Sequence, residues 1–204
     1  PHDPAEGREI GLFGGSFDPP TNAHLFAAEY ARAALSLDEV WLVLARQNPL
    51  KAGRTFTPPE IRREMLAAAL EGHDRLRLEG CELDRPGPSY TYDTVVHLRR
   101  MHPGVRFLLL LGMDAVLTLP RWYRAEELRE LVEIVVLTRP GVELSRLDRS
   151  WLEKVRLLDM PLQESSSTEV RRRVRAGLPV TGLVPPGVAA IIDREKLYRS
   201  GQGG

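Results

Sequence analysis

The stretch IGLFGGSFDPPTNAH, residues 10–24, joins a short apolar run, a glycine pair, a proline turn and the start of an alanine-rich pattern. The apolar run predicts a buried strand, which Gly14 and Gly15 end. The turn then places Thr21 and His24 at the start of an amphipathic helix. Free backbone N–H groups and the positive end of a helix dipole attract phosphate, so this strand–turn–helix predicts nucleotide chemistry.

This segment matches neither of the two common phosphate-binding glycine motifs. Gly11, Gly14 and Gly15 lack the spacing of GxGxxG, and GxxxxGK[ST] is absent. Thr21 and His24 share one side of the first helical turn, where an imidazole can donate hydrogen bonds to phosphoryl oxygens. The alternative is that Thr21 only caps the helix and His24 packs.

Apolar runs of strand length alternate with helical patterns along the whole chain. The strands are expected at 10–13, 40–45, 76–78, 105–111, 134–138 and 155–158, and the helical patterns at 23–35, 58–70, 93–101, 126–131, 168–176 and 188–193. Continuous apolar strands separated by helices favour a parallel sheet that is covered on both faces. We therefore expect an α/β fold, a Rossmann-like doubly wound parallel sheet with helices on both faces and a small C-terminal helical part.

One domain over residues 1–204 is expected, with an α/β core at 8–163 and a C-terminal helical phosphate-binding part at 164–200. Ligands of such sheets bind in the loops that follow the strands. Five loops follow the expected strands, at 14–24, 46–57, 112–122, 139–141 and 164–168.

The last of these loops opens a helix with three serines and a threonine. Ser167 and Thr168 offer hydroxyls at the helix start, and Arg171 follows one turn later, which together would form a polyphosphate cradle. The alternative is a capped surface helix with solvated arginines, as we expect for Arg172 and Arg173.

The bulk composition excludes several classes of protein. Lys+Arg and Asp+Glu both number 28 in 204 residues, and a formal net charge of zero argues against a nucleic-acid binder. The single cysteine, Cys81, excludes an internal disulfide framework and a thiolate metal cluster. No apolar run reaches the roughly 18 residues of a membrane span, so no membrane partner is expected and the cytoplasm is the default compartment. No HxxxH spacing or carboxylate cluster points to a protein-bound metal. The sequence leaves open whether the chain forms a homo-oligomer.

Six short motifs together resemble the nucleotidyltransferase superfamily with (H/T)xGH and SxTxxR signatures, and most closely its bacterial nicotinate-nucleotide adenylyltransferases. They are GGSFDP at 14–19, NPLK at 48–51, SYTYDT at 89–94, LGMD at 111–114 with Trp122 downstream, RPG at 139–141 and STEVR at 167–171. SYTYDT and the tryptophan separate this family from the phosphopantetheine adenylyltransferases.

Four positions depart from the family pattern. Thr21 stands where the family usually has its first histidine, which shifts catalytic weight onto His24. Ala23 replaces a glycine, Leu50 a histidine and Ser165 an isoleucine.

The resemblance implies an adenylyltransferase of NAD biosynthesis that joins ATP and nicotinate mononucleotide into nicotinate adenine dinucleotide and pyrophosphate. It implies that His24 binds the α- and β-phosphates, that Thr21 hydrogen-bonds nearby, and that Mg²⁺ bridges the phosphates. The leaving pyrophosphate would be held by Ser167, Thr168 and Arg171. Further ATP contacts are expected from Gly14, Gly15, Ser16, Phe17, Gly112 and Asp114.

For the nicotinate mononucleotide, the resemblance implies stacking on Trp122 and backbone N–H donors at Thr91 and Tyr92, with Lys51 and Arg139 as further contacts. Each has an alternative: Trp122 as a core residue, Lys51 as a solvated loop cation. Asp114 would accept a ribose hydroxyl or, alternatively, be a buried helix-capping carboxylate.

Two other functions stay open from the sequence. One is adenylyl or cytidylyl transfer to another phosphate, such as that of nicotinamide mononucleotide or phosphopantetheine. The other is a nucleotide-binding regulator that has lost the chemistry. Thr21 favours it, whereas the presence of His24, Lys51, Arg171 and the SYTYDT loop disfavours it.

Overall fold

The chain forms one six-stranded, all-parallel sheet with the strand order β3-β2-β1-β4-β5-β6. The computed structural model describes residues 7–47, 49, 57–138, 149–161, 163 and 165–199. The strands are β1 Glu9–Gly15, β2 Glu39–Leu44, β3 Leu76–Glu79, β4 Arg106–Gly112, β5 Glu133–Thr138 and β6 Arg156–Asp159. The chain builds outward from β1 to β3 and then returns to β4 on the other side of β1, which confirms the predicted doubly wound sheet.

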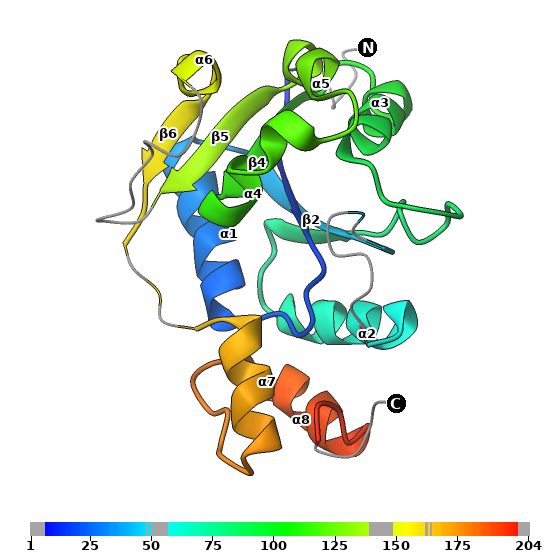
Figure 1. Ribbon diagram of the computed structural model, residues 1–204, viewed down its shortest axis with the longest axis vertical. Coiled ribbons are helices and arrows are strands. Elements are labelled where there is room, and N and C mark those ends of the chain that lie inside the picture. The colour runs from blue at the N-terminus through cyan, green and yellow to red at the C-terminus, as the bar shows by residue number, and fades with distance from the viewer. Residues whose placement is uncertain are drawn as a thin grey trace.

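Helices cover both faces of the sheet (Figure 1). They are α1 Asn22–Ala34, α2 Pro59–Ala69, α3 Thr91–Met101, α4 Met113–Val116, the 3₁₀ turn η2 Leu119–Arg121, α5 Ala125–Leu131, α6 Arg149–Leu152, α7 Ser167–Arg175 and α8 Pro186–Arg194. Each predicted strand and helix is present, with both ends within two residues of the predicted bounds. The short elements α4, η2 and α6 were not predicted.

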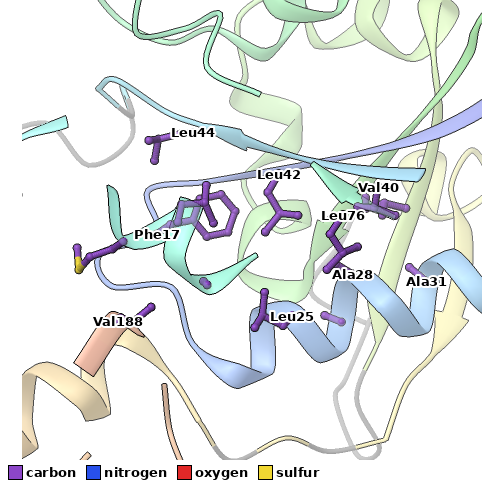
Figure 2. Packing of buried hydrophobic residues seen from close by; sticks show 14 of the residues in the cluster. Phe17, Leu25, Ala28, Ala31, Val40, Leu42, Leu44, Leu76 and Val188 are labelled. Atoms are coloured by element: carbon purple, nitrogen blue, oxygen red, sulfur yellow. The ribbon is translucent and has the colours of Figure 1, made fainter. Parts of the chain in front are cut away.

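Alternate residues of the central strands feed two separate cores. On β4, Leu108 and Leu110 face the core that α1, α2 and α8 cover, whereas Leu109 and Leu111 face the core under α3 and α5. Both faces of the central strands bury apolar side chains, which is why the strands read as continuous aliphatic runs. Figure 2 shows the first core, where the small residues of α1 lie against β2.

The C-terminal helices α7 and α8 pack on this first core at one end of the molecule (Figure 1). Val170 of α7 and Val188 of α8 are fully buried in it. Arg194 of α8 also pairs with Glu64 of α2 at 2.7 Å. Within the described residues, no helix has the length and apolar character that a membrane span requires.

Candidate active site

A cavity of about 190 Å³ opens at the carboxyl ends of β1, β2 and β4. Gly14 and Gly15 of β1 and Gly112 of β4 line its inner side, and Trp122 and the start of α3 line its outer side. Since β1 and β4 are the strands between which the strand order reverses, the cavity lies at the switch point where such sheets bind ligands.

The glycines at this edge have two separate roles. A Cβ atom on Gly14 or Gly112 would meet no other atom within 4 Å, so both present open backbone to the cavity. A Cβ on Gly15 would lie only 2.8 Å from the ring of Phe17. The Phe17 side chain is itself 2% exposed, so it belongs to the core and only its backbone could contact a nucleotide.

His24 lies in the first turn of α1, and its ring is held from two directions. Its Nδ1 atom lies 3.0 Å from the backbone N of Thr21 and 2.8 Å from Thr21 Oγ1. A backbone N–H can only donate, so Nδ1 is the acceptor and the ring proton belongs on Nε2. The ring of Phe17 packs edge-on against the imidazole, with centroids 5.3 Å apart. Thr21 is the N-cap residue of α1, as the capping alternative predicts, but it also orients the histidine.

Two side chains of the serine loop, Ser165 and Ser167, join the two halves of the predicted phosphate site. Ser165 Oγ accepts a hydrogen bond from Ala23 N at 2.9 Å, and Ser167 Oγ donates to the Pro19 carbonyl at 2.8 Å. Between them, Ser166 caps α7 by accepting from Glu169 N at 3.2 Å. The N-termini of α1 and α7 therefore meet at the loop that follows β1, where both helix dipoles favour an anion.

The arginines of α7 divide between this loop and the surface. Arg171 Nη1 donates to the Asp18 carbonyl at 2.7 Å, and Arg171 Nη2 lies 3.2 Å from Thr168 Oγ1. Arg172 and Arg173 instead bond Glu169, and these hydrogen bonds lower the pKa of Glu169 to about 2. Of these three arginines, Arg171 is the one that bonds the loop after β1.

A buried arginine that the sequence does not single out organises the neighbouring loops. Arg62 of α2 is 1% exposed, and its guanidinium donates to four backbone carbonyls at 2.7–3.0 Å. The four carbonyls belong to Ser16, Ala45, Arg46 and Thr57. Burial lowers the pKa of Arg62, but the planar fork retains its charge and ties the loops after β1 and β2 together.

The far side of the cavity combines aromatic rings with a helix N-terminus. Thr91 begins α3, so the N–H groups of its first turn have no partner within the helix. Trp122 lines the cavity with its Nε1 atom bonded to Thr118 Oγ1 at 3.1 Å. Tyr92 is not a lining residue, because its ring packs under the Arg124 guanidinium at 4.1 Å. Its backbone N–H is the group that could reach a ligand.

The remaining predicted residues fall in two groups. Asp114 is exposed in the first turn of α4, so the alternative that it is a buried cap is wrong. Lys51 and Arg139 lie outside the described residues, as do Asn48 and Leu50. In the part of the chain that is described, no three His, Cys, Asp or Glu side chains converge in a way that could hold a metal ion.

The fold and the paired helix N-termini at a glycine-ended β1 define a nucleotidyltransferase-type domain, and residues 12–173 match the family described as cytidylyltransferase-like. A protein of Geobacillus kaustophilus, named as a probable nicotinate-nucleotide adenylyltransferase, is 41% identical over 96% of this chain and 88% of its own length. The nicotinate-nucleotide adenylyltransferase of Bacillus subtilis is 34% identical over 95% of this chain and its full length. The chain belongs to the nicotinate-nucleotide adenylyltransferase family, which confirms the resemblance of its motifs.

Among solved structures, the fold is similar to that of the nicotinic acid mononucleotide adenylyltransferase of Plasmodium falciparum in complex with NaAD. The TM-score is 0.77 at 21% identity, and the match covers 94% of this chain and 97% of the other. At 21% identity, this structural similarity supports the fold alone.

Proposed function

We propose that the chain transfers the adenylyl group of ATP to nicotinate mononucleotide, forming nicotinate adenine dinucleotide and pyrophosphate in NAD biosynthesis. The observation that carries this is the pair of subsites flanking the end of β1. On one face, the N-termini of α1 and α7 meet beside His24. On the other, the cavity presents Trp122 and the N-terminus of α3.

The two subsites suit two anionic substrates that react over the glycines between them. A phosphate oxygen of nicotinate mononucleotide attacks the α-phosphorus of ATP and forms a new P–O bond. The bond from that phosphorus to the bridging oxygen of the β-phosphate breaks, and pyrophosphate leaves with both electrons. The nucleophile is already an anion, so catalysis needs positioning and charge stabilisation rather than a strong base.

His24 is assigned to the transferred group. With Nδ1 occupied by Thr21, the Nε2–H is the donor that would bind the α- and β-phosphate oxygens and stabilise the pentavalent phosphorus. Thr21 is completely buried, so we assign it to holding the histidine rather than to touching phosphate itself.

Ser167, Thr168 and Arg171 are assigned to the leaving pyrophosphate. All three lie in the first two turns of α7, where the helix dipole and the guanidinium favour negative charge. Lys51 is proposed as a further phosphate contact from the loop after β2. Arg139 is proposed as a further contact to nicotinate mononucleotide.

Mg²⁺ is proposed to accompany ATP rather than to occupy a protein cage. The one carboxylate in the loop after β1, that of Asp18, is 5% exposed and already accepts hydrogen bonds from Tyr198 and the Thr57 backbone. When bound to the phosphates, the ion would neutralise charge that builds up on the leaving pyrophosphate.

The cavity is assigned to the pyridine ring and its carboxylate. Trp122 can stack on the electron-poor ring, and the first-turn N–H groups at Thr91 and Tyr92 can donate to the carboxylate. The open backbone at Gly112 and the exposed Asp114 are assigned to the adenosine part of ATP. We propose that the α/β core and the C-terminal helices act as one domain. We also propose that the protein acts in the cytoplasm, where ATP is plentiful.

The test is incubation with Mg-ATP and one of three acceptors: nicotinate mononucleotide, nicotinamide mononucleotide or 4′-phosphopantetheine. Pyrophosphate release should be fastest with nicotinate mononucleotide and absent with 4′-phosphopantetheine. Release with neither pyridine nucleotide would refute the proposed function.

A further inference from the structure

A buried carboxyl group lies in the wall of the cavity on the same side as the start of α3. Glu82 follows β3, is 7% exposed, and lines the cavity. None of the roles assigned above uses it. A carboxylate in the wall of a pocket assigned to a second carboxylate would oppose binding, so its surroundings need an explanation.

Glu82 bonds two hydroxyls that bracket the start of α3. Thr94 Oγ1 donates to Glu82 Oε1 at 2.6 Å, and the Ser89 hydroxyl is a second hydrogen-bond partner of the carboxyl group. Arg85 Nη2 in turn donates to Thr94 Oγ1 at 2.6 Å, which leaves the threonine proton for the carboxyl group. Ser89 and Thr94 are the first and last residues of the SYTYDT segment.

The same segment is tied to the loop after β2 through Ser89. Ser89 Oγ accepts from Arg46 N at 3.0 Å, and Ser89 N donates to the Gln47 carbonyl at 2.9 Å. Glu82 therefore connects the N-terminal turn of α3 to the backbone that follows β2. Moving Glu82 would move the first-turn N–H groups relative to the cavity.

We propose that Glu82 is a positioning residue for the carboxylate of nicotinate mononucleotide: by fixing Ser89 and Thr94 it holds the first turn of α3 and sets the preference for the acid over the amide. This inference rests on the proposed function, because it concerns the acceptor of that reaction.

The surroundings of Glu82 shift its pKa. Burial raises its pKa, against the opposing effects of the Thr94 and Ser89 hydrogen bonds and of Arg85. The hydrogen bonds from Thr94 and Ser89 hold the carboxyl group in place beside the start of α3.

The test compares E82A and E82Q with the wild-type chain, with separate KM values for the two substrates. E82A should raise the KM for nicotinate mononucleotide about tenfold, the loss expected when a hydrogen bond to a charged group is misplaced. The KM for ATP should change by less than about twofold, and the ratio of kcat/KM for the acid to that for the amide should fall about tenfold. E82Q, which keeps the shape without a charge, should restore both values to within about threefold.

E79A is the matched control, because Glu79 lies three residues earlier and its carboxylate bonds the Cys81 backbone instead of the segment at α3. If E82A fails to fold, S89A breaks the same link and should show the same selective loss. A rise of both KM values together, or an unchanged acid-to-amide ratio in E82A and S89A, would overturn the inference.

Calorimetric binding of each mononucleotide separates this inference from the proposed function, because it needs no turnover. Tighter binding of the acid than of the amide by the wild-type chain, with the difference lost in E82A, would support the positioning role of Glu82 even if the chain showed no turnover. A wild-type chain without turnover would count against the proposed function alone. Equal binding of acid and amide by the wild-type chain would overturn the role of Glu82.

Discussion

The Tyr198 hydroxyl donates a hydrogen bond of 2.5 Å to Oδ1 of Asp18, a residue 180 positions earlier in the chain. Burial, together with the nearby carboxylate of Asp18, raises the pKa of Tyr198 above its ordinary value, so the phenol keeps its proton. Asp18 lies in the loop after β1, and its backbone carbonyl also accepts a hydrogen bond from Arg171. The end of the chain thus stabilises the loop that carries the proposed phosphate site.

Replacing Tyr198 by Phe should destabilise the protein by about 1–3 kcal/mol, because Asp18 loses a hydrogen bond in a buried position. The free energy of unfolding in urea measures the change. Y30F is the control, since the Tyr30 ring stacks on Phe26 within α1, whereas the Asp18 carboxylate accepts its hydrogen bonds from Tyr198 and the Thr57 backbone. Equal unfolding midpoints for Y198F and the wild-type chain would contradict the structural role of this hydrogen bond.

The H24A variant should lower kcat by at least about 10², because it removes the donor assigned to the transferred phosphate. T21V should lower kcat less, since Nδ1 keeps its bond from the Thr21 backbone when the hydroxyl is removed. Steady-state kinetics with saturating substrates measure both, and H97A on α3 is the matched control. A larger loss in T21V than in H24A would contradict the assignment of the two side chains.

Arg171 and Arg172 are adjacent on α7 and allow a matched comparison. R171A should lower kcat/KM for ATP by about 10², because a guanidinium at the phosphates stabilises the departing charge. R172A should stay within about twofold, since it only breaks an exposed ion pair with Glu169. Similar kinetic constants for the two variants would show that Arg171 has no special role.

R62M should destabilise the protein by at least about 2 kcal/mol, because four backbone carbonyls lose a buried donor. R62K should recover only part of the lost stability, since one ammonium group cannot reproduce the hydrogen bonds of the planar guanidinium. Its neighbour Arg63 is exposed, so R63M is the control for loss of charge from α2. Thermal unfolding of the three variants is the measurement, and an R62M curve that superimposes on that of R63M would refute the role.

The layered fold followed from local patterns, whereas much of the site depends on contacts that no local pattern encodes. The aliphatic run of β4 and the apolar periodicity of α1 predicted those elements because each buries a whole face. The turns α4 and η2 are too short to show a period.

The spacing of Thr21 and His24 predicted a shared face but not which ring nitrogen accepts. Arg62 sits in a helical pattern like any surface arginine, and only the tertiary fold brings four carbonyls to it. Tyr198 and Glu82 were missed for the same reason. The roles of Lys51 and Arg139 remain predictions.

The central claim is attack on the α-phosphorus of ATP by the phosphate of nicotinate mononucleotide. The most direct measurement follows two ATP samples, one labelled at the α-phosphate and one at the γ-phosphate, in the presence of Mg²⁺ and nicotinate mononucleotide. The account predicts that the α-label appears in nicotinate adenine dinucleotide and the γ-label in an equal amount of pyrophosphate. Release of the γ-label as inorganic phosphate, with no α-label in a dinucleotide, would contradict it.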